Sequence, residues 1–168
     1  MKQLDYYIQE KLKITKDTKI NKYNYQPIDE YNLRRILEDK LKDDKNADLN
    51  DIDLSKIDYL GELEKLEHGN YTTYGLFENL DPYNIDISKW DVSHIKDMQS
   101  MFKGCENLNC DLSNWDVSNV KWMTNMFNGC KKLNCDLNNW DVKNVKDMSD
   151  IFKKCPLEKN PPKWYNKK

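Results

Sequence analysis

Hydrophobic residues recur with a fixed 25-residue period from Asp86 onward. Each unit has a Trp, a Val, a Met, a Phe and a Cys at the same offsets, with Asp, Asn and Ser in between. The units read DISKWDVSHIKDMQSMFKGCENLNC from Asp86, DLSNWDVSNVKWMTNMFNGCKKLNC from Asp111 and DLNNWDVKNVKDMSDIFKKCPLEKN from Asp136. This period predicts a repeat solenoid in which each unit stacks on its neighbours.

Within the middle unit, Leu108, Cys110 and Leu112 alternate with polar residues. Alternation with period two is typical of a strand with one buried face. The pattern predicts a short strand over residues 107–113.

Further along the same unit, apolar residues from Val120 to Phe127 follow helical spacing, with Gly129 as a stop. This spacing predicts a short helix over residues 119–128. Together the two elements predict an α/β repeat solenoid with short parallel strands and short helices.

Two amphipathic segments precede the repeats. Residues 1–14 place Leu4 and Ile8 on one helical face, and Asp29 is positioned to cap a second helix that runs to about Lys42. We therefore expect an N-terminal helical segment and linker over residues 1–47.

The segment DLNDIDLSKIDYLGEL from Asp48 matches the start of the first unit, with Ile52 in place of the Trp. It predicts a degenerate capping repeat over residues 48–85, with its helical side lengthened by the insertion that contains His68. The regular repeats then occupy 86–160. Residues 161–168 form a C-terminal cap and tail, in which Trp164 covers the last layer because the prolines before it stop the repeat.

The motif Trp-Asp-Val-Ser-Asn-Val, Met, Met-Phe, Gly-Cys and Leu between Asp86 and Cys155 resembles the bacterial surface-protein (BspA-like) type of leucine-rich repeat, in its 25-residue variety of unassigned function. The resemblance implies a curved right-handed superhelix with a parallel sheet on one face, used to bind proteins. Relatives are often secreted or lipid-anchored, whereas the N-terminus here has no export signal, which favours the cytoplasm.

Composition narrows the classes of partner. The 168 residues are 38% hydrophobic, with a mean hydropathy of −0.97 and a formal net charge of −2. A near-neutral chain without a basic patch argues against nucleic acid. The first amphipathic segment is too short to cross a membrane, so we expect no membrane partner.

Five cysteines at spacings of 5, 20, 5 and 20 residues should form columns of buried, reduced packing thiols. Zinc favours closer pairs of ligands, and an odd number of cysteines argues against a full set of disulfides. A metal site and a disulfide or redox role remain the alternatives.

The Asp residues that repeat beside the turns should accept backbone hydrogen bonds, with calcium as the alternative. They are Asp86, Asp111 and Asp136, and Asp91, Asp116 and Asp141. His94 takes the position of Asn119 and is expected to be a solvent-facing turn residue. We therefore expect no metal, no cofactor and no catalytic residues.

Two surfaces are candidates for a partner. Trp122 replaces the Asp of the flanking units and should point outward as an interface anchor; alternatively it lies against lysines or on the N-terminal helices. The predicted sheet face presents short polar residues suited to hydrogen bonding. These are Asn84, Asp86, Ser88, Asn109, Asp111, Ser113, Asn134, Asp136 and Asn138.

The hypothesis that follows is a non-enzymatic protein-binding leucine-rich-repeat scaffold or adaptor. The alternative is a phage or mobile-element protein that inhibits a host protein or associates with the virion, as residues 1–14 suggest. The corresponding locations are the cytoplasm, or the host cytoplasm or virion. The sequence predicts neither the partner's identity nor the oligomeric state.

Overall fold

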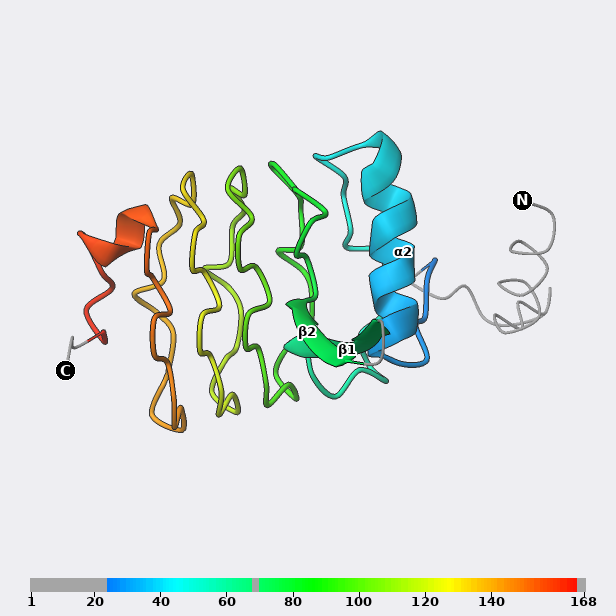
Figure 1. Cartoon of the computed structure of the whole chain (residues 1–168). Coiled ribbons are helices and arrows are strands. Elements are labelled where there is room, and N and C mark those ends of the chain that lie inside the picture. The colour runs from blue at the N-terminus through cyan, green and yellow to red at the C-terminus, as the bar shows by residue number, and fades with distance from the viewer. Residues whose placement is uncertain (1–23, 68–69, 166–168) are drawn as a thin grey trace, which may run out of the picture.

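The structure, a computed structural model, describes residues 24–67 and 70–165. Its elements are helix α2 (Glu30–Asp43), strands β1 (Glu62–Glu67) and β2 (Asn70–Gly75), and the 3-10 helix η1 (Pro156–Glu158). The repeats follow as coils that lie side by side in chain order (Figure 1), with α2 beside the first coils and η1 beside the last. Neither helix in this part of the chain is long and apolar enough to cross a membrane.

The prediction of an α/β repeat solenoid with short parallel strands and short helices is wrong. The only sheet in the described ranges is the antiparallel pair β1–β2, which lies before the regular repeats. Residues 107–113 and 119–128 contain turns, irregular backbone and a single bridge residue, Trp122. The leucine-rich-repeat superhelix and its sheet face are therefore not what this chain forms.

The physical reason lies in the turns. Backbone N–H groups bond to the carbonyl three residues back, as from Val120 to Val117 (2.9 Å) and from Met126 to Met123 (3.2 Å). Such turns satisfy the apolar spacing of three that also suits a helix. The carboxylate of Asp111 meanwhile accepts the N–H of Ser113 and so bends the predicted strand.

Neighbouring coils are nevertheless held in register. Isolated parallel bridges join Trp122 to Asp97 on one side and to Asp147 on the other. The indole Nε1 of Trp115 donates to the Ile87 carbonyl, and that of Trp140 to the Leu112 carbonyl, each at 3.0 Å. Equivalent residues thus occupy equivalent places in successive coils.

The core is a column of aromatic rings along these coils. The Phe rings stack with centroids 4.9, 5.8 and 6.0 Å apart, in the order Phe77, Phe102, Phe127 and Phe152. The ring of Trp164 stacks on that of Trp140 at 6.3 Å, which confirms the prediction that Trp164 covers the last layer.

At the other end, α2 confirms the second predicted helix. Asp29 caps it by accepting the N–H of Asn32 at 2.7 Å, and Leu33 and Leu37 are among its buried residues. The insertion after residue 61 forms the β1–β2 hairpin, so the prediction of a lengthened helical side is wrong. The helix predicted over residues 1–14 lies outside the described residues.

Candidate functional site

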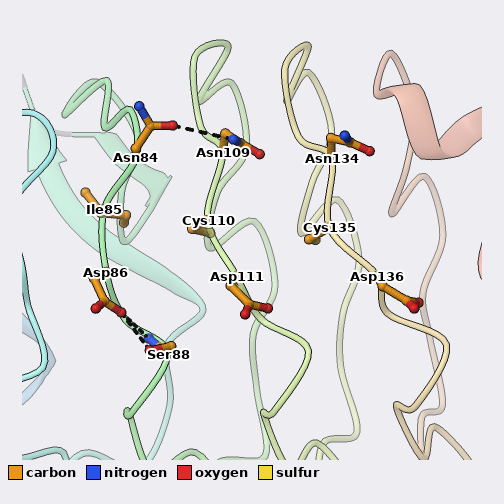
Figure 2. Close-up of a pocket in the computed structure, with 10 residues that line it drawn as sticks. All are labelled: Asn84, Ile85, Asp86, Ser88, Asn109, Cys110, Asp111, Asn134, Cys135 and Asp136. Carbon is orange, nitrogen blue, oxygen red and sulfur yellow. Dashed lines mark hydrogen bonds between the residues drawn. The ribbon is translucent and has the colours of Figure 1, made fainter.

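A groove of about 580 Å³ crosses three successive coils. Each coil contributes an Asn, an apolar or thiol residue, and an Asp, so that three parallel rows run along it (Figure 2). The groove is lined by Asn84, Ile85, Asp86, Ser88, Asn109, Cys110, Asp111, Asn134, Cys135 and Asp136.

Two of the three side chains in the Asn row, those of Asn84 and Asn109, are linked by an amide hydrogen bond. The Asn109 Nδ2 donates to the Asn84 Oδ1 at 3.5 Å, and the Asn84 Nδ2 donates to the Asn46 Oδ1 at 3.2 Å. Asn46 thus extends the row by one coil. The signal for this was the match between the segments that begin at Asp48 and Asp86, which places Asn46 at the position of Asn84, two residues before the Asp.

In the Asp row, each carboxylate accepts the N–H two residues on. The pairs are Asp86 with Ser88 (3.0 Å), Asp111 with Ser113 (2.9 Å) and Asp136 with Asn138 (2.9 Å). Hydrogen bonds to each of these carboxylates lower its pKa. The main donor is the side chain of Asn50 for Asp86, the side chain of Ser113 for Asp111 and the backbone N–H of Asn138 for Asp136. The groove therefore carries three negative charges at neutral pH.

This geometry confirms the prediction that the repeated Asp residues hold turns. The second row does the same, as Asp91 accepts the N–H of Ser93 and Asp116 that of Ser118. Within the described residues, no group of three or more His, Cys, Asp or Glu side chains is placed to hold a metal ion.

Cysteines form part of the groove floor. Cys110 is buried and Cys135 half-buried, and all five cysteines of the chain are free thiols. Burial raises the pKa of the Cys135 thiol to about 12 and that of Cys110 well above its usual value. Both thiols are therefore protonated at neutral pH and are poor nucleophiles and metal ligands.

Seven of the nine predicted sheet-face residues line the groove, although no sheet supports them. Ser113 and Asn138 instead serve as hydrogen-bond donors to the Asp row. Sequence reasoning missed Ile85, Cys110 and Cys135, because it placed the middle residue of each Asn-X-Asp triplet on the buried face of a strand.

Trp122 lies apart from the groove lining. Its exposed fraction is 38%, as predicted for an outward residue, but it lies on a bridged turn and not on a helix face. The Lys146 Nζ lies 5.6 Å from the centroid of the Trp122 ring. The surroundings of Trp122 therefore match the alternative prediction, in which it lies against lysines.

His94 is not the solvent-facing residue that the sequence predicted. It is half-buried, and its Nε2 lies 3.1 Å from the Leu54 carbonyl oxygen and 2.9 Å from that of Ile57. Because both partners are acceptors, Nε2 carries the proton and donates. Asn119 makes the equivalent link to Ser93 one coil later, at 2.7 Å. His94 is thus a tie between coils.

The described chain is therefore a repeat protein whose coils present a polar groove. Residues 70–165 match the family described as "Mycoplasma protein of unknown function, DUF285", and since this is more than half of the chain, the protein belongs to that family. No curated protein and no solved structure matches the sequence.

Proposed function

We propose that this protein is a non-enzymatic scaffold that binds a partner protein in the groove. The observation that carries the proposal is the groove itself, which equivalent positions of three coils line with amides and carboxylates. A surface built by repetition offers the same hydrogen-bonding groups at each step, which suits a partner segment laid across the coils.

A non-enzymatic role is supported by the interactions of the carboxylates and thiols in the groove. Its carboxylates accept backbone N–H groups, as Asp111 does from Ser113, and its thiols are held protonated by burial. A general base or nucleophile needs a free lone pair directed at a substrate. These groups are occupied in holding turns and filling the floor.

Charge favours a protein over a nucleic acid. Asp86, Asp111 and Asp136 have a lowered pKa and stay ionised, so they repel phosphate and attract lysine or arginine. The Asn row adds amide donors and acceptors that match a peptide backbone. We therefore propose a partner segment that is basic and extended.

We also propose that the repeats are of the BspA-like type, because the Trp-Asp-Val, Met-Phe and Gly-Cys positions recur in the units from Asp86 and Asp111. We propose the cytoplasm as the location, since five free thiols suit a reducing compartment. The alternative of a phage inhibitor or virion protein rests on residues 1–14, outside the described residues.

The test is affinity capture with quantitative mass spectrometry. The groove variant is Asn109→Ala with Asn134→Ala, which removes two amides of the row. The matched control is Asn114→Ala with Asn139→Ala, which removes two exposed asparagines of the same coils that do not line the groove. Trp122→Ala forms a third arm.

We expect the groove variant to lose at least about tenfold of one captured protein, equivalent to about 1.4 kcal/mol, while the control retains it. If only Trp122→Ala loses the captured protein, the binding site is at Trp122 and not in the groove. Equal capture by all variants would contradict the proposal.

A further inference from the structure

One row of backbone hydrogen bonds between the coils runs in a single direction, while other bonds, such as those from Lys121 to the Lys96 carbonyl and from Lys146 to the Lys121 carbonyl, run the opposite way. The N–H groups of one coil donate to the carbonyl groups of the next, at 2.8 to 3.0 Å. The donors of the first unit are Met98, Ser100, Phe102 and Gly104, and those of the second are Met123, Asn125, Phe127 and Gly129. The third unit therefore points the equivalent N–H groups of Met148, Asp150, Phe152 and Lys154 away from the stack.

The C-terminal segment supplies an acceptor for one of these four donors, since the Lys154 N–H donates to the Glu158 carboxylate at 2.9 Å. No acceptor for the N–H groups of Met148, Asp150 and Phe152 is found among residues 24–67 and 70–165. Phe152 is buried, and its ring contacts those of Trp164 and Tyr165. Met148 is half-buried and Asp150 exposed, so the N–H groups of these two residues are the open donors of the edge.

The backbone at Asp150 is already set for a further coil. Its φ of 55° matches the 54° of Ser100 and the 59° of Asn125, whose N–H groups both donate to a next coil. The N–H of Asp150 is therefore oriented like theirs, because the same turn is repeated.

The side chains around these donors are uncovered as well. Val142, Val145 and Met148 are only partly buried, whereas their counterparts in the two preceding units are at most 1% exposed. Those counterparts are Val92, Ile95 and Met98, and Val117, Val120 and Met123. In Figure 1 the C-terminal segment lies beside the upper part of the last coil and leaves its lower part open. We call Val142, Val145, Met148 and Asp150 the C-terminal edge.

At the opposite end of the stack, open backbone groups are hydrogen-bonded by side chains. There the carbonyl groups of Gly75, Leu76 and Glu78 accept from the Arg34 Nη1, at 3.3, 2.7 and 2.9 Å. The Lys45 Nζ similarly donates to the Leu80 carbonyl. Cations thus close the end that presents acceptors, and a carboxylate closes one donor of the other end.

We propose that the C-terminal edge binds an extended segment of a partner protein, whose carbonyl oxygens accept from the N–H groups of Met148 and Asp150. Apolar side chains of that segment cover Val142 and Val145. Addition of a chain to an exposed backbone edge is an established mode of peptide recognition. The site is separate from the groove and stands whether or not the groove binds.

A second copy of the chain fits this edge poorly. Besides the two open N–H groups, the edge presents one carbonyl, that of Lys146, whose counterparts on Lys96 and Lys121 accept from the following coil. Two such edges related by a twofold axis would therefore leave at least one of the two N–H groups of each copy without an acceptor. A head-to-tail arrangement needs free carbonyls at the other end, which Arg34 and Lys45 already occupy. An extended chain with free carbonyl groups meets both requirements.

The experiment is an NMR titration of the ¹⁵N-labelled full chain. The probe is a synthetic peptide of residues 119–129, the segment that presents its carbonyls to the first unit, and a scrambled peptide of the same composition is the control. We expect the probe, but not the scrambled peptide, to shift the amide signals of Met148 and Asp150 and to leave the groove unchanged.

A variant pair tests the apolar part of the edge. Val142→Thr with Val145→Thr keeps the shape of both side chains, and we expect about tenfold weaker probe binding than in the wild type. Lys143→Ala, an exposed change in the same coil, should bind as the wild type does.

Three results would overturn the proposal. The first is an absence of shifts at both amides up to about 1 mM probe, the weak end of measurable affinity. The second is shifts confined to the groove. The third is protection of both amides on raising the concentration of the protein alone, which would make a second copy the occupant.

Discussion

At the scale of single residues, carboxylates define the path of the chain. Asp111 and Asp116 each accept the N–H two residues on, and so begin two turns of one coil. Hydrogen bonds from serine lower the pKa of both carboxyls. Because the folded pKa lies below the unfolded value, these groups stabilise the fold only while they are ionised.

Acid should therefore destabilise the protein through the turns. We expect the melting temperature to change little between about pH 7 and pH 5, and to fall once the pH drops below about 4, the ordinary pKa of Asp. Asp111→Asn with Asp116→Asn keeps an acceptor that does not titrate, so its fall between about pH 5 and pH 3 should be smaller. Thermal melts followed by circular dichroism measure this, and an equal fall in variant and wild type would contradict it.

The thiols give a second prediction. Burial raises the pKa of Cys105 and Cys135 to about 12, so we expect slow reaction with a thiol reagent in the native protein. After denaturation without reductant, titration should count all five thiols. A count of one or three would mean that disulfides form, and would contradict the reduced columns.

Single-residue roles could be predicted where the cause is local. The turn carboxylates and the exposure of Trp122 follow from neighbours in the sequence. The role of His94 could not be predicted, because its acceptors on Leu54 and Ile57 belong to another coil. Asn46, by contrast, could have been predicted, because the match of Asp48 with Asp86 places it at the position of Asn84, to which it is hydrogen-bonded.

At the scale of elements, the repeats consist of turns where helices and strands were expected. An apolar residue at every third position suits a helix and a succession of turns equally, and the sequence does not separate the two. The α2 helix was predictable because a cap at Asp29 precedes an amphipathic run of 14 residues. The β1–β2 hairpin was not, because the insertion has no counterpart in the other units.

Two glycines test how closely the hairpin packs. A Cβ on Gly75 would lie 1.9 Å from the Ser100 carbonyl oxygen, whereas one on Gly104 would meet nothing within 4 Å. We expect Gly75→Ala to cost roughly 3 kcal/mol of unfolding free energy through overpacking. Gly104→Ala should cost about 1 to 2 kcal/mol, because its φ of 75° strains an alanine. Urea unfolding measures both, and equal losses would refute the close approach.

Arg34 joins α2 to the coils, and its removal should be costly. Arg34→Met leaves the carbonyls of Leu76 and Glu78 without their donor, and we expect a loss of roughly 2 to 3 kcal/mol in urea unfolding. Lys42→Met changes an exposed charge of the same helix and serves as the control. A loss no greater than that of the control would show that the N-terminal edge needs no cation.

At the scale of the whole molecule, the stack has a direction. In the rows that start at Met98 and Met123, N–H groups face the C-terminal end and carbonyl groups the N-terminal end, whereas the bond from Lys121 to the Lys96 carbonyl runs the opposite way. The period in the sequence predicted that the coils repeat, but not this polarity, because it depends on turn geometry. The groove and the C-terminal edge are two consequences of the same repetition.

Amide hydrogen exchange of the free protein tests the directed stack most directly. The N–H groups of Met98, Ser100, Met123 and Asn125 donate to a following coil, so we predict that they exchange slowly. Those of Met148 and Asp150 have no acceptor among the residues that the structure describes and should exchange at least about 100-fold faster. Equal protection of all six amides would contradict the account.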